Sequence, residues 1–449
     1  MILLHKKPEL LLIGAFSIAL MAGCNNNIRQ FIVPIPKPSG DPSNPSQAVV
    51  LATNPVQGAN GITMHIDVSG DSNVGQVNTG PNPVFLGKTS GRVFVINGDN
   101  TITSYIALSP TTSLVNTVTQ PGSVSGTVAG GTGNNGSFYA INNGSNDLSQ
   151  VSAGTLAVTQ TIAVGSGPVA IAGNSVNNVN SKIYVVNNGS NNVTVISTID
   201  NSVLKTIPVG SHPIWGVMAD NGIQVFIVNQ GDGTATNPGS VSVIDTNLDT
   251  VIPCSGTGCD ATTGAISLGF TPATSSPNFA FYDGKRQRLY VSNTGESSIS
   301  VIKADGINLG VTPQVVPSLL ANISITAPPT SVAALSDGSK AYAALGGCPS
   351  GTNHTNLLAR LASCTGSQVS VIDTNALAEI TPAINVGAGA VSIDAAADAS
   401  RVYVVGAQAG NISIIRTTSN TVSTTLTPAL DSSCTSNCTH IPFMVRIFP

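Results

Sequence analysis

A short phrase made of an aromatic residue, two small or β-branched residues and an asparagine recurs along this chain. Five clear copies are present: Phe94–Asn97, Tyr139–Asn142, Tyr184–Asn187, Phe226–Asn229 and Tyr290–Asn293. Three degenerate copies begin at Leu51, Tyr342 and Tyr403, and successive copies start 42 to 64 residues apart. A strand-rich repeat of this length predicts a β-propeller, because each unit supplies one small sheet and the sheets pack around an axis.

The unit at 182–222 shows how many strands each repeat supplies. Asn and Gly clusters interrupt it, and an Asn221-Gly222 pair is typical of a tight hairpin turn. Between these turns lie four strand-like segments: Ile183–Val186, Val193–Ile196, Val203–Val209 and Ile214–Ala219. Four antiparallel strands per unit predict one propeller blade.

The third strand and the corner that follows each unit carry further motifs. Val-Ser-Val-Ile-Asp-Thr occurs at 241–246 and again at 369–374, and an Ile-x-Val-Gly corner precedes both Pro168 and Pro213. With the repeated phrase, these motifs resemble the YVTN-family β-propeller repeat of surface-layer-like and other secreted microbial proteins. The resemblance covers nearly everything after residue 47. It implies the propeller fold and says little about function.

We predict an all-β fold with a single propeller of eight blades, spanning 47–449. Inner strands are expected to start near eight residues: Pro83, Pro121, Pro168, Pro213, Pro277, Pro329, Gly389 and Pro442. Seven blades, the commoner number in the family, is the alternative if one weak unit is not a blade. The chain is expected to close the ring with strands from both ends in one shared blade: Val49–Thr53, Ile62–Val68, Val74–Val77 and Phe443–Ile447.

The N-terminal segment predicts export and a lipid anchor. Basic residues precede an apolar run at 10–21, and the sequence Leu-Met-Ala-Gly-Cys ends at Cys24. This resembles the lipobox of bacterial lipoproteins, which implies a signal peptide at 1–23 and lipidation of Cys24. Residues 24–46, rich in Pro, Asn and Ser, are expected to form a tether. Asn25 is not the Asp that the family associates with inner-membrane retention, so we favour the outer membrane.

Cysteine spacing fits an oxidising compartment. Without Cys24, six of the seven cysteines remain, in three local pairs: Cys254 with Cys259, Cys348 with Cys364, and Cys434 with Cys438. We interpret these pairs as disulfides. The rival interpretation, a metal site at Cys434, Cys438 and His440, lacks a fourth ligand nearby, so we predict no metal.

Composition excludes several functions. Only 8% of the 449 residues are charged, and the net charge is −4 with no basic run, so no nucleic-acid partner is expected. Only Glu296 and Glu379 remain beyond the signal, which argues against a paired-Glu glycosidase. No convincing helix is predicted, and hence no Gly-rich loop that opens a helix to cradle phosphate. We therefore expect no cofactor.

The remaining polar residues mostly have structural interpretations. Six aspartates recur at turns, where the side chain bonds the backbone: Asp200, Asp220, Asp245, Asp283, Asp337 and Asp373. Asp394 falls in an inner strand and is a candidate for facing the central channel, where a solvated wall is favoured over catalysis. His212 is assigned to a corner and Trp215 to packing between blades. His65, His354 and His440 are isolated in the sequence and form no catalytic arrangement.

Enlarged loops give the clearest functional hypothesis. Two connections between second and third strands, 229–240 and 346–367, and one between blades, 430–441, are expected to emerge on one face of the ring. The 254–259 pair is expected on the opposite face. We interpret the protein as a monomeric, non-enzymatic module that binds protein or glycan at the cell envelope, with neutral drift of the loops as the rival view. The alternative from another class is a lactonase-like hydrolase or a sugar- or quinone-dependent oxidoreductase with an axial site. Three or more converging carboxylate, Asn or His groups at the axis would favour that enzyme.

Overall fold

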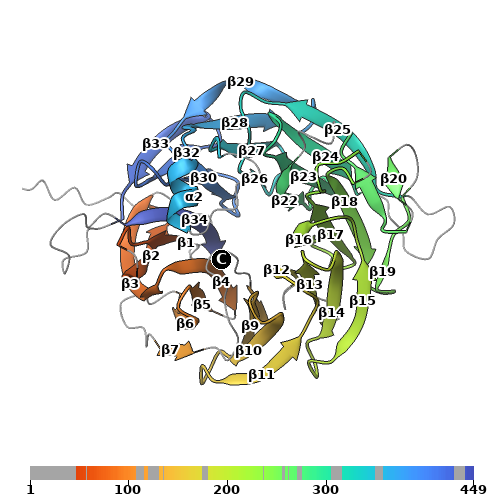
Figure 1. Cartoon of the computed structure of the whole chain (residues 1–449). Helices are drawn as coiled ribbons and strands as arrows, with labels where there is room; N and C mark the ends of the chain where they lie inside the picture. The colour runs from red at the N-terminus through yellow and green to blue at the C-terminus, as the bar shows by residue number, and fades with distance from the viewer. Residues whose placement is uncertain are drawn as a thin grey trace, which may run out of the picture. The chain divides into compact units, whose positions relative to one another are not determined.

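A ring of eight antiparallel sheets around a common axis forms the folded part of this protein (Figure 1). The computed structural model describes residues 47–448, apart from 57, 90, 108–115, 120–130, 135, 174–180, 236, 255–257, 261, 270–275, 305–315, 349–356 and 429–439. By its contacts the chain divides into Met1–Ser39 and Gly40–Pro449, and every described residue belongs to the second unit. The prediction of eight blades is confirmed, and the alternative of seven is wrong.

Within each blade the strands are numbered from the axis outward, and the blades are numbered in the order of their second strands. The first strands are β34 (Ile441–Phe448), β4 (Pro83–Thr89), β8 (Gly131–Asn134), β12 (Pro168–Ala172), β16 (Pro213–Met218), β22 (Pro277–Asp283), β26 (Ser331–Ala334) and β30 (Ala390–Ala395). The second strands are β1 (Gln47–Thr53), β5 (Arg92–Asn97), β9 (Ser137–Asn142), β13 (Lys182–Asn187), β17 (Gln224–Asn229), β23 (Arg288–Asn293), β27 (Lys340–Leu345) and β31 (Arg401–Gly406).

The third strands are β2 (Asn60–Asp67), β6 (Thr101–Ile106), β10 (Asp147–Ser152), β14 (Asn192–Ser197), β18 (Ser240–Asp245), β24 (Ser298–Lys303), β28 (Gln368–Asp373) and β32 (Asn411–Arg416). The fourth strands are β3 (Ser72–Pro81), β7 (Asn116–Thr119), β11 (Val158–Ala163), β15 (Val203–Pro208), β21 (Ala265–Ser267), β25 (Ser318–Ser324), β29 (Ala378–Asn385) and β33 (Thr421–Leu426). Blade 5 adds two short strands, β19 (Thr250–Val251) and β20 (Cys259–Asp260). No helix among the described residues is both long and apolar enough to cross a bilayer.

Blade 1 contains both ends of the described chain, as the sequence predicts. Its sheet has the order β3-β2-β1-β34, and β1 pairs with β34 antiparallel from Gln47 opposite Phe448 to Thr53 opposite Ile441. Val50 and Val445 face each other in this pairing and are fully buried. The C-terminal strand therefore supplies the inner edge of a sheet whose other strands come from the N-terminal end.

Blade 3 differs from the prediction in its first strand. We expected this strand to start near Pro121, which lies outside the described residues, but the first strand is β8, Gly131–Asn134. β8 is set by a tight turn, with Gly136 at φ 83°, that brings Asn134 opposite Ser137. The proline marks the corner in other blades. Here the hairpin turn fixes the register.

The tyrosine of the repeated phrase links three of the blades to the blade that follows. Three tyrosine hydroxyls donate hydrogen bonds to the following blade: Tyr139 to Asn201 (2.7 Å), Tyr184 to Asp249 (2.8 Å) and Tyr342 to Asn420 (2.8 Å). Each acceptor lies in the turn between third and fourth strands and has positive φ, which Asn and Asp tolerate best among non-glycine residues. The tyrosine therefore recurs because its ring fills the seam and its hydroxyl reaches the adjacent sheet.

The asparagine of the phrase stabilises the opposite end of the same strand. Asn187 is fully buried, and its Nδ2 donates to Asn192 Oδ1 (2.8 Å) and Thr194 Oγ1 (2.9 Å). Thr194 Oγ1 also accepts the backbone N–H of Gly165 (3.3 Å), which belongs to the connection from the preceding blade. A Cβ at position 165 would lie 2.6 Å from Asn187 Nδ2, so the corner requires glycine.

Two tyrosines of the phrase, Tyr290 and Tyr403, lack this clamp, and restoring it at Tyr290 should stabilise the protein. Tyr290 is fully buried, and its hydroxyl finds no acceptor in the described part of the chain. The position that holds Asn or Asp at the three clamped seams is here Leu377 (φ 51°), which packs in the same apolar cluster. Leu377→Asn is expected to raise the free energy of unfolding by about 1 kcal/mol, because a buried hydroxyl gains an acceptor and the turn gains a residue suited to positive φ.

Urea unfolding of the wild type, Leu377→Asn and Leu377→Ala checks this expectation. The alanine variant removes the leucine side chain without supplying an acceptor, so it should be less stable than both others. An asparagine variant no more stable than the alanine variant contradicts the proposed clamp.

Candidate functional site

Turns and connections divide between the two faces of the ring. The loop after the second strand bonds to the corner between blades, as where the Gln230 N–H donates to His212 O (2.9 Å) and the Ala390 N–H donates to Gly366 O (3.0 Å). The turn after the third strand bonds to the turn after the first, as where the Thr246 N–H donates to Ile223 O (3.1 Å). We name the first of these faces the loop face. The enlarged loops 229–240 and 346–367 both belong to it.

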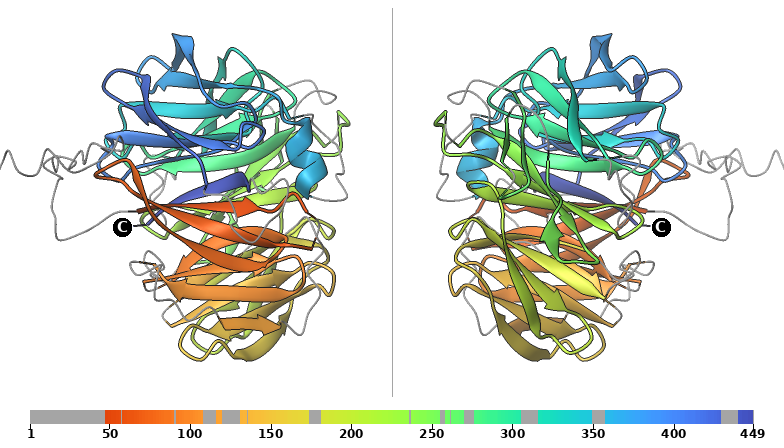
Figure 2. Two further views of the ribbon diagram at one scale, coloured as in Figure 1. Left: turned by 90° about the vertical axis from the view of Figure 1, so that its left-hand side faces the viewer. Right: turned by 90° about the vertical axis from the view of Figure 1, so that its right-hand side faces the viewer.

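The described parts of the loop 346–367, residues 346–348 and 357–367, form an arm that lies across neighbouring blades. A disulfide joins Cys348 to Cys364 at its base. Its helix α2 (Leu357–Ser363) buries Leu361 in an apolar cluster that contains Phe443 of blade 1. Figures 1 and 2 show α2 at the margin of one face, with the C-terminus of the chain at the opposite one.

The arm corrects the expectation that the chain has no helix. Leu357 and Leu361 lie four residues apart and thus on one side of α2, and both pack against the same cluster. The intervening residues, Leu, Ala and Arg, are good helix formers. Gln408 of blade 8 adds a polar contact by donating from Nε2 to the carbonyl of Ala362 (2.7 Å). The arm is therefore held by a covalent bond, apolar packing and a hydrogen bond.

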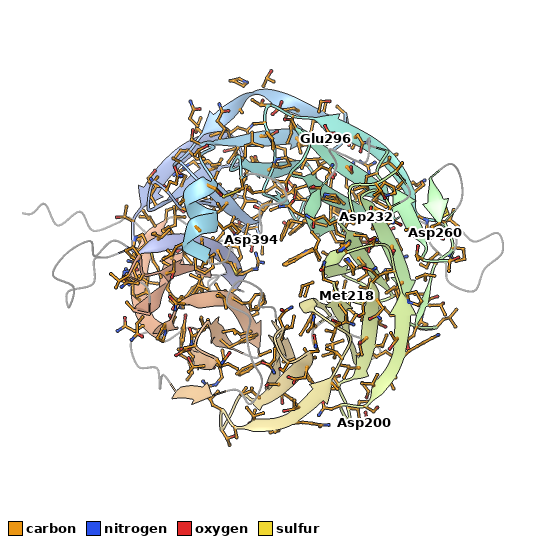
Figure 3. The ribbon with its side chains drawn as sticks, viewed as in Figure 1. Asp200, Met218, Asp232, Asp260, Glu296 and Asp394 are labelled. Carbon is orange, nitrogen blue, oxygen red and sulfur yellow. A yellow bond between two sulfur atoms is a disulfide. The ribbon has the colours of Figure 1, made fainter. Side chains whose placement is uncertain are left out.

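The second enlarged loop, 229–240, is ordered by an aspartate. Asp232 Oδ1 accepts the backbone N–H of Thr234 (2.9 Å), and Oδ2 accepts from Asn237 Nδ2 (2.7 Å). Hydrogen bonds from the Thr234 and Asn237 side chains and from the Thr234 backbone hold the pKa of Asp232 below its ordinary value. Figure 3 labels Asp232 in this loop. The loop is thus a closed hairpin fixed by its own polar side chains.

Two of the three predicted disulfides are formed, and the other cysteine predictions lie outside the described residues. Cys254 and Cys259 are joined in blade 5, in the connection between third and fourth strands. Cys259 pairs with Ile266, which itself lies opposite Val241 near the loop-face end of β18, so the disulfide lies at the outer rim of the blade and not on the opposite face as expected. They line a hollow of about 220 Å³ together with Leu319 of blade 6. Cys434, Cys438 and Cys24 are outside the described part of the chain, as is most of the loop 430–441.

Asp394, the one acid expected at the axis, ties the ends of the ring together. It projects from β30, and its Oδ2 accepts the backbone N–H of Ile447 on β34 (2.9 Å). Ser392, two residues earlier, accepts the N–H of Val445 (3.2 Å). Figure 3 shows Asp394 on the inner side of the ring, across from Met218. Desolvation by the surrounding protein raises the pKa of Asp394. The role that the structure shows for Asp394 is to accept a backbone N–H at the inner edge of the closing strand.

His65 belongs to a buried polar network that the sequence did not reveal. Its Nδ1 lies 2.9 Å from Gln47 Oε1, and its Nε2 lies 2.8 Å from the hydroxyl of Tyr105. That hydroxyl also contacts Thr63 Oγ1. His65 and Tyr105 are fully buried, and burial lowers the pKa of His65 to about 4. This network joins blades 1 and 2, and its His65 and Tyr105 side chains are buried away from any substrate.

Two further residues have the roles predicted for them. Trp215 packs on Phe279 of the next blade with ring centroids 4.8 Å apart, and its Nε1 donates to Ala280 O (3.2 Å). His212 occupies a corner at φ 49°, and its N–H donates to Asn191 Oδ1 (2.8 Å). His354 lies outside the described residues.

Most of the turn aspartates also behave as predicted. Five of them accept backbone N–H groups two or three residues ahead: Asp200, Asp245, Asp283, Asp337 and Asp373. Asp220 departs from the pattern, because its carboxylate lies directly against Gly284 of the next blade. Burial, with a smaller contribution from Asp283, raises the pKa of Asp220. Across the described residues, no three His, Cys, Asp or Glu side chains are grouped as ligands for a metal ion.

Comparisons with known proteins identify the fold and no family. No family model and no curated protein matches the chain. Hydrazine synthase from Kuenenia stuttgartiensis is 15% identical with a TM-score of 0.50, and the match covers 75% of this chain and 96% of that one. Dihydro-heme d1 dehydrogenase NirN, solved in complex with DHE, is 13% identical with a TM-score of 0.60, covering 87% and 74%. Apo AztD from Citrobacter koseri is 10% identical with a TM-score of 0.55, covering 90% and 98%. The comparisons therefore establish an eight-bladed β-propeller fold and leave its function to the geometry of its own residues.

Proposed function

We propose that this protein is a non-enzymatic binding module whose loop face holds a protein or glycan partner. The observation that carries the proposal is the arm at 346–367, which is fixed by the Cys348–Cys364 disulfide and by α2 packed across two other blades. A helix that is already packed, such as α2, loses little entropy on binding, so less of its contact energy is spent on ordering.

The proposal extends to the place where the module works. A lipid on Cys24, a signal peptide at 1–23 and a tether at 24–46 would anchor a monomeric, YVTN-type propeller at the bacterial cell envelope, with the outer membrane favoured. The enlarged loops would then be presented to partners in the periplasm or at the cell surface. An enzyme with an axial site is the alternative. Two structural neighbours are named as enzymes, but identities of 13–15% carry only the fold.

Binding by matched disulfide variants tests the proposal. Recovery of envelope proteins and binding to a glycan array are measured for three forms of the 47–449 chain: wild type, Cys348→Ser/Cys364→Ser and Cys254→Ser/Cys259→Ser. The first double variant loosens the arm on the loop face, and we expect it to weaken binding of the wild-type partner by about tenfold. The second removes a disulfide at the outer rim of blade 5, away from the arm, and should bind as the wild type does.

A third variant, Arg360→Glu, changes an exposed residue of α2 and leaves Leu361 in place. It should weaken binding without changing the melting temperature. Equal binding by all forms would reject the loop face as the recognition surface. Conversion of a compound by the wild-type protein in these binding experiments would favour the alternative of an enzyme with an axial site.

A further inference from the structure

Among the described residues, the two most exposed large apolar side chains lie in turns of neighbouring blades. Ile199 is 83% exposed and belongs to the turn after the third strand of blade 4. Leu248 is 68% exposed and belongs to the same turn of blade 5. Val203 and Leu204, at the start of β15, are also exposed. Single apolar residues are common on protein surfaces, whereas a group of them indicates a contact surface.

Hydrogen bonds to the adjacent residues Ser181 and Lys182 hold these two turns close together. The Thr198 N–H donates to Ser181 O (2.7 Å), which fixes the turn of blade 4. Lys182 Nζ donates to Thr246 O (3.1 Å) and to Asp249 Oδ2 (2.7 Å), which fixes the turn of blade 5. Strands β15 and β19, which follow the two turns, are also in contact. The four apolar residues above therefore form one surface, which we name the seam patch.

The seam patch lies on the face opposite the loop face, where the described chain begins. Turns after third strands belong to that face, and β1 runs from it toward the loop face, so Gln47 lies there too. The residues before Gln47 include the apolar run 10–21 and Cys24. Blades 1 and 5 are four places apart in a ring of eight, and Figure 1 shows β1 and β19 on opposite sides of the axis. The point where the chain enters and the seam patch are thus widely separated on one face.

We propose that the seam patch docks on a lipid bilayer and, together with the tether, sets the orientation of the propeller. The inference rests on the anchor at Cys24 that belongs to the proposed function, and it adds a second contact. A tether over residues 25–46 spans roughly 25 Å as a flexible coil and roughly 70 Å when fully extended. This confinement gives the bilayer a high effective concentration at the patch, so a few apolar side chains suffice for docking.

The charges next to the seam patch largely cancel. Asp200 and Lys205 are both exposed and carry opposite charges. Lys182 is paired with Asp249, so its charge is already compensated within the seam. Docking would therefore depend on the burial of apolar area, and salt should change it little.

Tryptophan fluorescence on vesicles of phosphatidylethanolamine and phosphatidylglycerol tests the docking. The propeller closes within residues 47–448, so a chain of residues 25–449 with an N-terminal histidine tag keeps the whole ring. A nickel-chelating lipid holds this chain on the vesicle through the tag, which takes the place of a lipid on Cys24. Lipids with brominated acyl chains then quench those tryptophans that reach the bilayer.

We expect brominated lipid to quench Ile199→Trp and Leu248→Trp strongly. The matched control is Val56→Trp, because Val56 is 51% exposed and lies in the loop after the second strand of blade 1, on the loop face. Its quenching should not exceed that of the wild type, whose only tryptophan is Trp215. Quenching of the two patch variants should persist at high salt.

Quenching of the patch variants no stronger than that of the Val56→Trp control, or quenching that disappears at high salt, overturns the proposal. A change in emission that follows protein concentration and not lipid would assign the patch to contact with a second copy, and would also overturn it. The anchor is tested separately, by membrane fractionation of bacteria that produce the full-length wild type or Cys24→Ala. Equal membrane recovery of these two forms would reject the anchor, whereas the vesicle measurement alone decides the docking.

Discussion

Deleting residues 441–449 is expected to prevent the propeller from reaching a stable folded state. The deletion removes β34, whose Phe443, Val445 and Phe448 are at most 5% exposed. Burial of three such side chains contributes about 5–9 kcal/mol, which is comparable with the whole free energy of unfolding of an ordinary protein, about 5–15 kcal/mol. The deletion also exposes one edge of β1, which then lacks its hydrogen-bonding partner along seven residues. Circular dichroism and size-exclusion chromatography should show lost cooperativity and aggregation.

A peptide supplied in trans is the control for this deletion. A synthetic peptide of residues 440–449 should restore the cooperative melt when added to the truncated chain, because the strand is joined to the ring by pairing and packing. A scrambled peptide of the same composition should not. Cooperative unfolding of the truncated chain near the wild-type temperature, without any peptide, would show that the closing strand is dispensable.

Acid should destabilise the protein through His65. The pKa of this residue is about 4 in the folded state against an ordinary value of 6.5. Between these values the unfolded chain binds a proton that the folded chain does not, so stability falls as pH falls through this window. A difference of this size corresponds to about 3 kcal/mol, present in full above pH 6.5 and lost by about pH 4. Urea unfolding at pH 7, 6, 5 and 4 measures this loss.

The contribution of His65 is isolated by comparison with variants. His65→Gln cannot titrate but retains hydrogen-bonding atoms, so its stability should fall less between pH 6.5 and 4 than that of the wild type. His212→Gln alters an exposed histidine at a corner and should keep the wild-type pH dependence. Parallel curves for the wild type and His65→Gln would contradict the assignment.

The sequence predicted the architecture well because the contacts that define it are local and repeated. The aromatic and Asn of the second strands recur with the spacing of the blades, and several of them make the same contacts at their seams. Closure was also predictable, because β1 lacks a first strand before it and Ile441–Phe448 lacks a blade after it.

Features that depend on contacts between distant residues were not predictable. The network of His65 joins residues 18 and 40 positions away in the sequence, on strands that no shared motif connects. The helix α2 is too short to show amphipathic periodicity, and its partners lie in two other blades. The first strand of blade 3 was misplaced because Pro121 imitates a corner residue, whereas a glycine turn sets the strand. Each failure comes from tertiary contacts that override a local signal.

The pairing of Gln47 with Phe448 has a consequence for orientation at a membrane. Second strands end at the loop face and therefore begin at the opposite face, so Gln47, the first described residue, lies at that opposite face. If Cys24 carries a lipid, as we propose, the protein would turn that face toward the bilayer. Its α2 arm would be turned outward, away from the bilayer and toward whatever approaches from solution.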